Sequence, residues 1–117
     1  MAFTNPESSP LRILVIGRDP KILQVVLRLL NTHASKAYHA VGTTDADQAR
    51  SLFADSDIGL VLLTNGIDAA TEASLREEFA IRRPGVPVLQ HYGGGSGLLF
   101  GEIAAATGRH RQTKDTH

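Results

Sequence analysis

The chain has 117 residues, enough for one domain with a single core, and its 12 basic residues balance its 12 acidic ones, so no net charge favours nucleic acid or an anionic membrane as a partner. It has no cysteine, which excludes disulfides and cysteine metal sites and fits a cytoplasmic protein. No apolar run reaches the roughly 18 residues of a membrane-spanning helix, so we expect no membrane partner. We expect a disordered lead-in at residues 1–10, one folded domain at 11–107 and a disordered tail at 108–117.

A strand followed by a helix is predicted for the stretch Leu11–Leu30. Arg12–Ile16 is a short apolar run rich in β-branched residues, and Gly17 breaks it. Asp19 and Pro20 are typical of a helix start, because the carboxylate caps free amides and proline already has a helical φ. The helix has two neighbouring apolar stripes, so we expect it to touch the sheet on one side and a helix or partner on the other. The first stripe consists of Leu23, Val26, Leu27 and Leu30, and the second of Ile22, Val25 and Leu29.

A second strand is predicted at Lys36–Val41, followed by a second helix. Thr44, with Asp47 three residues later, resembles a capping box. We expect the buried face of this helix to consist of Ala46, Ala49, Leu52 and Phe53.

The most apolar run, Gly59–Leu63, is predicted as the central strand, buried on both faces. Asp68 or Thr71 caps the third helix, which Pro84 and Gly85 end. We expect Leu75 and Phe79 to face the core, and the charged residues to form a mostly solvated outer face, namely Arg76, Glu77, Glu78, Arg82 and Arg83.

The fourth strand is predicted at Val86–Gln90, before a glycine run. Ser96 then caps the last helix, whose inner positions are Leu99, Ile103 and Ala106. Strands and helices that alternate at this spacing indicate an α/β fold, a three-layer doubly wound parallel sheet with four strands and four helices.

Three segments carry a resemblance to a known family: RILVIGRDP, IGLVLLTNG and RRPGVPVLQHY. They are similar to the first strand with its acidic loop, the third strand, and the fourth strand of the receiver domains of bacterial two-component response regulators. The resemblance spans most of Leu11–Ala106 and implies a flavodoxin-like fold and a role in phosphorelay signalling.

The residues that carry the family's phosphoryl chemistry are replaced here. The family binds Mg²⁺ with an acid pair after the first strand and with an aspartate after the third, which also takes up the phosphoryl group. In this sequence the acid pair falls on Gly17 and Arg18, next to Asp19, and the phospho-accepting position falls on Thr64. The family also contacts the phosphoryl oxygens with a threonine or serine at the end of the fourth strand, a position that falls on Tyr92, and with a lysine after the fifth strand, which has no match here. The resemblance therefore implies the scaffold without the reaction, and we expect no catalytic residue, metal or cofactor.

Arg18 places a permanent cation at this degenerate pocket. Two interpretations stay open: its guanidinium holds the loop by bonding Asn65, Asp68 or the carbonyls after the third strand, or it points to solvent.

The chain is also shorter than the family. The resemblance implies that the fourth helix and fifth strand are missing, so that the last helix covers Ile22, Val25 and Leu29. Val86–Gln90 then becomes a sheet edge, and exposed edges invite pairing. We therefore expect a homodimer formed through this strand or through the first helix.

Two hypotheses about function follow. The first is a phosphorylation-independent, receiver-like signalling module that acts by protein–protein interaction with a partner signalling protein. The alternative is a small anion- or nucleotide-binding domain, because glycines before a helix let backbone amides approach a phosphate. Its binding loop would consist of Gly93, Gly94, Gly95 and Ser96.

Overall fold

The computed structural model describes residues 10–33, 36–55, 57–91 and 95–107, so the lead-in expected before residue 10 and the tail expected at 108–117 lie outside the described residues. Within the described residues, strands and helices alternate along the chain. Their bounds are β1 (Leu11–Ile16), α1 (Pro20–Asn31), β2 (Tyr38–Thr43), α2 (Ala46–Asp55), β3 (Leu60–Leu63), α3 (Ala69–Arg82), β4 (Val88–Gln90) and α4 (Gly95–Thr107).

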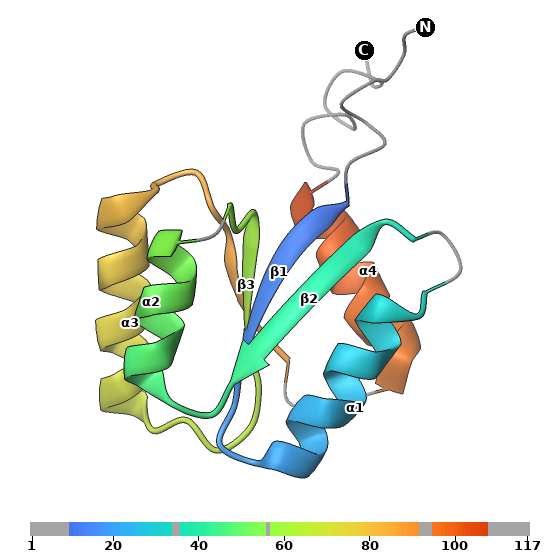
Figure 1. The fold of residues 1–117 in the computed structure, drawn as a ribbon, viewed down its shortest axis with the longest axis horizontal. Helices are drawn as coiled ribbons and strands as arrows, with labels where there is room; N and C mark the ends of the chain where they lie inside the picture. Colours follow the sequence, from blue (N-terminus) through green and yellow to red (C-terminus); the bar gives the residue numbers. More distant parts are fainter. Residues whose placement is uncertain (1–9, 34–35, 56, 92–94, 108–117) are drawn as a thin grey trace, which may run out of the picture.

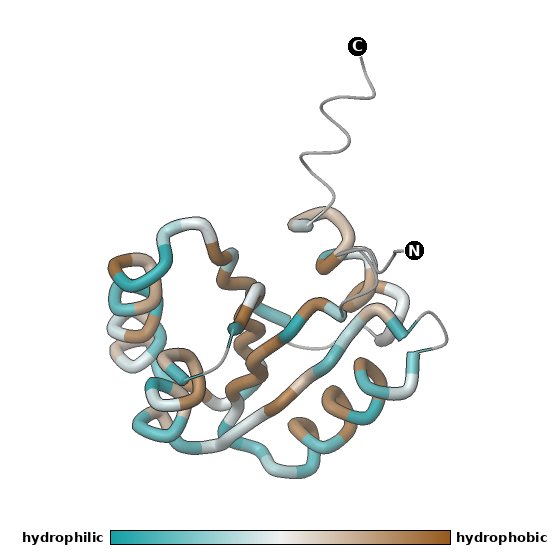
Figure 2. The backbone as a smooth tube through the Cα atoms, turned by 45° about the horizontal axis from the view of Figure 1, so that its top comes forward, coloured by the Kyte–Doolittle hydropathy of each residue, from teal (hydrophilic) through white to brown (hydrophobic). Residues whose placement is uncertain are grey.

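All neighbouring strands are parallel, and their order in the sheet is β2-β1-β3-β4. Helices α1 and α4 cover one face of the sheet, and α2 and α3 cover the other (Figure 1). Hydrophobic residues gather along the central strands between these two helical layers (Figure 2). The predicted three-layer, flavodoxin-like α/β fold is therefore confirmed.

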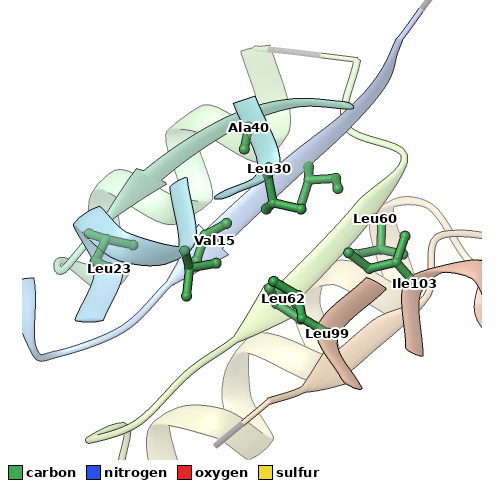
Figure 3. Close-up of a cluster of buried hydrophobic side chains, with 10 residues drawn as sticks. Val15, Leu23, Leu30, Ala40, Leu60, Leu62, Leu99 and Ile103 are labelled. Carbon is green, nitrogen blue, oxygen red and sulfur yellow. The ribbon is translucent and has the colours of Figure 1, made fainter. Parts of the chain in front are cut away.

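The core on the α1 and α4 face joins both helices to the central strands (Figure 3). Leu99 and Ile103 are buried there and Ala106 packs against them, as predicted for the last helix. Ile22 and Leu29 also pack against this core, but Val25 is wrongly predicted, since it remains 58% exposed. One apolar position of α1 thus stays open to solvent.

The core on the other face is built around two stacked rings. Phe53 of α2 and Phe79 of α3 have ring centroids 4.2 Å apart, and Arg50 Nε donates to Glu78 Oε1 at 2.8 Å across the same two helices. Arg83, predicted to be part of a solvated face, is half-buried instead: its guanidinium donates to the Phe53 and Ile58 carbonyls. The prediction that the charged residues around α3 face solvent is therefore wrong for Arg83, which follows the last residue of the helix.

The second strand lies two residues later than predicted. Lys36 has a left-handed φ of 56°, which a strand cannot accommodate, so β2 begins only at Tyr38. It continues through Gly42, which is paired with Val15 of β1. A Cβ at that glycine would lie 2.8 Å from Leu23 Cδ1. Gly42 is therefore a close-packing residue of β2 under α1 and does not end the strand.

Two predicted helix caps are wrong. In α2 the cap is Asp45 and not Thr44, since Asp45 Oδ1 accepts the Asp47 amide at 3.1 Å. In α4 the helix already includes Gly95, which places Ser96 inside it and not before it.

Strand β4 is shorter than predicted, since it comprises Val88–Gln90 alone, and it lies at the edge of the sheet. Among the described helices, none is both long enough and apolar enough to cross a bilayer.

Candidate functional site

The loops after β1 and β3 meet at the carboxyl edge of the sheet, where open α/β folds place their binding sites. Gly17 follows β1 and Thr64 follows β3, and both are buried. A Cβ built on Gly17 would lie 1.9 Å from Thr64 Oγ1. The two residues therefore fill the space together, and no side chain at position 17 fits while Thr64 keeps its place.

Thr64 is fixed by two bonds to one carbonyl. Its amide donates to the Ile16 carbonyl at 2.8 Å, and its hydroxyl donates to the same oxygen at 3.3 Å. A carbonyl oxygen cannot remove the hydroxyl proton, so this contact does not activate Thr64 as a nucleophile. The hydroxyl instead donates a second hydrogen bond to the last carbonyl of β1.

Arg18 lies against the loop after β3. Its amide donates to the Asn65 carbonyl at 3.1 Å, and its Nη2 lies 3.7 Å from Asp68 Oδ1. Gly66 has a φ of +93°, and a Cβ there would lie 2.7 Å from Arg18 Cβ. The guanidinium therefore lies near Asp68, as one interpretation expected, while both side chains are more than half exposed, as the other expected; the two interpretations stay open.

Asp68 caps α3, as predicted. The hydroxyl and amide of Thr71 both donate to its carboxylate, at 2.7 Å and 3.2 Å. These hydrogen bonds, foremost that of the hydroxyl, hold the pKa of Asp68 below its ordinary value, and the charge of Arg18 adds a smaller effect in the same direction.

Asp19 is engaged with its own helix. Its Oδ1 accepts the Lys21 amide at 2.9 Å and the Ile22 amide at 3.5 Å, so the residue caps α1 as predicted. Asp19, the carboxylate nearest the family's acid-pair position, therefore serves as the N-cap of α1. Within the described part of the chain, no group of three or more histidine, cysteine, aspartate or glutamate residues could hold a metal ion.

Part of the predicted site falls where the structure gives no description. Tyr92, Gly93 and Gly94 lie outside the described residues, while Gly95 and Ser96 form the first turn of α4. The anion-binding loop expected from these glycines thus stays a prediction.

His91 is a linking residue that the sequence did not reveal. It follows β4, donates its amide to the Leu63 carbonyl at 2.8 Å, and is 8% exposed. Its Nδ1 lies 2.9 Å from Glu102 Oε1, which ties the end of β4 to α4. The eleven-residue separation of the two side chains gives no periodic signal from which this contact could be predicted.

Comparison with known proteins was made by sequence and by structure. The sequence matches no protein-family model and none of the curated proteins compared with it. A response regulator receiver protein from Pseudomonas putida matches with a TM-score of 0.61 at 16% identity, over 86% of this chain and 82% of that one. A CheY-like receiver domain protein from Methanospirillum hungatei JF-1 gives 0.63 at 21% identity, over 83% of this chain and 74% of that one.

A third similar structure is the signal receiver domain of an HD domain-containing protein from Pseudomonas fluorescens Pf-5. Its TM-score is 0.61 at 21% identity, over 82% of this chain and 74% of that one. The three structures agree in architecture with the sheet and helical layers described above. The chain has the fold of the response regulator receiver domains.

Proposed function

We propose that the chain is a receiver-like signalling module that acts by protein–protein interaction and does not take up a phosphoryl group. The observation that carries the proposal is the contact of Gly17 with Thr64. At the positions where the resemblance expects a metal-binding acid and the phospho-accepting aspartate, these two residues pack against each other without a carboxylate. A hard cation such as Mg²⁺ needs carboxylate oxygens, which this arrangement does not supply.

The receiver-domain neighbours support the signalling part of the proposal, because their titles name response regulator receivers. If the module takes up no phosphoryl group, it acts by binding to a partner signalling protein. Because no phosphoryl group drives a switch, the partner meets a surface that is already formed.

The surface we propose for that partner is α1 around Val25. Val25 is 58% exposed, and a groove of about 220 Å³ beside it is lined by Gln24, Arg28 and Leu29. An exposed large apolar side chain next to a groove fits the apolar anchor of a partner protein.

A binding experiment tests the phosphate part. Amide spectra of the labelled chain are recorded with Mg²⁺ and beryllofluoride, with a receiver domain chosen because it binds beryllofluoride as the positive control. We expect no shifts in this chain and clear shifts in the control. Saturable shifts around Thr64 and Arg18 would overturn the proposal.

A matched pair of variants tests the surface. Val25→Asp should abolish co-purification of a histidine kinase or response regulator with the chain, whereas Ile81→Asp, at a site that is 74% exposed on α3, should leave it intact. Equal binding by both variants would place the partner elsewhere. Homodimerisation stays a prediction, and sedimentation of the parent chain at micromolar concentration tests it.

A further inference from the structure

Among the strands that the structure describes, β4 is an edge of the sheet, and the position of α4 accounts for this. Helix α3 connects β3 to β4 on the α2 and α3 face. A further parallel strand beyond β4, reached with the same right-handed crossover, needs its connecting helix on that face too. Helix α4 lies on the α1 face instead (Figure 1), so its path does not lead to a strand beside β4.

The outward backbone groups of β4 can be assigned from its bonds to β3. The Val61 amide donates to the Pro87 carbonyl, and the His91 amide donates to the Leu63 carbonyl, so Pro87 and His91 face β3. Since consecutive residues of a strand direct their amide and carbonyl groups to opposite sides, Val88 and Gln90 direct theirs away from the sheet.

This edge is self-complementary. In an antiparallel pair of two β4 strands related by a twofold axis at Leu89, Val88 of one copy lies opposite Gln90 of the other. Residues opposite each other in this way exchange both backbone bonds. The short strand therefore presents to a second copy a complete set of donors and acceptors.

Side chains of α3 occupy this edge. Arg76 Nη1 donates to the outward Val88 carbonyl at 3.1 Å, and Arg76 Nε donates to Glu72 Oε2 at 2.9 Å. The side-chain amide of Gln90 donates to the same Glu72 oxygen. Glu72, Arg76 and Gln90 thus form a polar clasp over β4, and the guanidinium lies on the carbonyl that a second strand would need.

We infer that this clasp closes the β4 edge against a second copy of the chain, and that the edge pairs about Leu89 once the clasp is opened. Proteins protect edge strands with charged side chains for this purpose. The sequence-based expectation of self-association through the fourth strand is thereby restricted to a chain that lacks the clasp. The inference does not depend on the proposed signalling function.

The test compares self-association of the full chain and three variants by sedimentation, together with hydrogen exchange of the Val88 and Gln90 amides. Arg76→Ala should lower the dimer dissociation constant by at least about tenfold and slow exchange at both amides as concentration rises. Arg82→Ala removes the same charge from the last turn of α3 and should behave as the parent. Glu72→Gln keeps Arg76 but weakens its bond to residue 72 by removing the carboxylate charge. It should therefore lower the dimer dissociation constant too, but by less than Arg76→Ala does.

A second substitution checks that the association uses this strand. Gln90→Pro in the Arg76→Ala background removes the outward amide of Gln90 while the bonds to β3 remain, so the double variant should sediment as the parent does. The inference is overturned if Arg76→Ala and Glu72→Gln both sediment as the parent does. It is also overturned if Gln90→Pro leaves the association unchanged, or if the parent already protects these amides as its concentration rises.

Discussion

Gly17 and Thr64 share a single space at the carboxyl edge of the sheet, with 1.9 Å between Thr64 Oγ1 and the point where a Cβ on Gly17 would lie. The contact joins the ends of β1 and β3, which are neighbouring strands paired from Ile13 with Leu60 to Ile16 with Leu63. It accounts for a glycine at position 17 by packing.

Gly17→Ala should destabilise the chain by about 1–3 kcal/mol, because the new methyl group displaces Thr64 from the Ile16 carbonyl. The cost should be smaller in a Thr64→Ala background, where the hydroxyl is absent. Urea unfolding of the four chains of this double-mutant cycle measures the coupling. Gly85→Ala is the control, since a Cβ there meets nothing within 4 Å; equal effects at both glycines would contradict the packing argument.

Arg18→Ala should cost less than about 1 kcal/mol, because its ion pair with Asp68 is 3.7 Å long and both side chains are more than half exposed. If the guanidinium held the loop through a charge-assisted hydrogen bond, the loss would be about 1 kcal/mol or more, and the observed exposure argues for the smaller value. Chemical denaturation at low and high salt checks it. A larger loss, accompanied by relaxation dispersion in the loops after β1 and β3, would show that Arg18 holds the loop.

Thr71→Ala should raise the pKa of Asp68 toward its ordinary value, and by more than Arg18→Ala does, since the Thr71 hydroxyl is the largest cause of the lowered pKa. Titration of the carboxyl carbon by NMR measures both variants. The reverse order would mean that the charge of Arg18, and not the cap, sets the protonation of Asp68.

The same lowered pKa makes a prediction for stability. A carboxyl whose pKa is lower in the folded state stabilises the fold above its unfolded pKa, and that contribution is lost as the pH falls through the folded pKa. The difference in unfolding free energy between the parent and Asp68→Asn should therefore decline on acidification, because asparagine caps without a charge. A difference that does not change with pH would contradict the linkage.

Arg83→Met should destabilise the chain by about 1–3 kcal/mol, because it leaves the Phe53 and Ile58 carbonyls without this charged donor and removes the guanidinium 4.6 Å above the Phe53 ring. Arg82→Met, at an exposed neighbouring position, should change stability by less than about 0.5 kcal/mol. Thermal and urea unfolding compare the pair. Similar stabilities for the two variants would mean that Arg83 contributes no more to stability than a solvated residue, as the sequence indicated.

The architecture could be predicted because the apolar runs and caps are local signals. Asp19 and Asp68 cap the helices that their positions indicated, and Leu99 and Ile103 face the core. The end of the second strand was predicted wrongly at Gly42. A glycine that is needed because Leu23 packs closely over it cannot be told from the sequence apart from a glycine that ends a strand.

Contacts between distant elements could not be predicted in this way. The clasp formed by Arg76 depends on the position of α3 beside the edge of β4, and the link from His91 to Glu102 depends on the face that α4 covers. The sequence placed Gly17 and Thr64 at corresponding strand ends, but their mutual exclusion follows only from the register of β1 with β3.

The central claim, that the chain does not take up a phosphoryl group, is tested most directly by intact mass. The chain is incubated with acetyl phosphate and Mg²⁺ beside a control receiver domain chosen because it takes up phosphate from acetyl phosphate, and both are weighed by mass spectrometry without acid or heat. The account predicts an unchanged mass for this chain while the control gains one phosphoryl group. A phosphoryl adduct on this chain that depends on Mg²⁺ would contradict it.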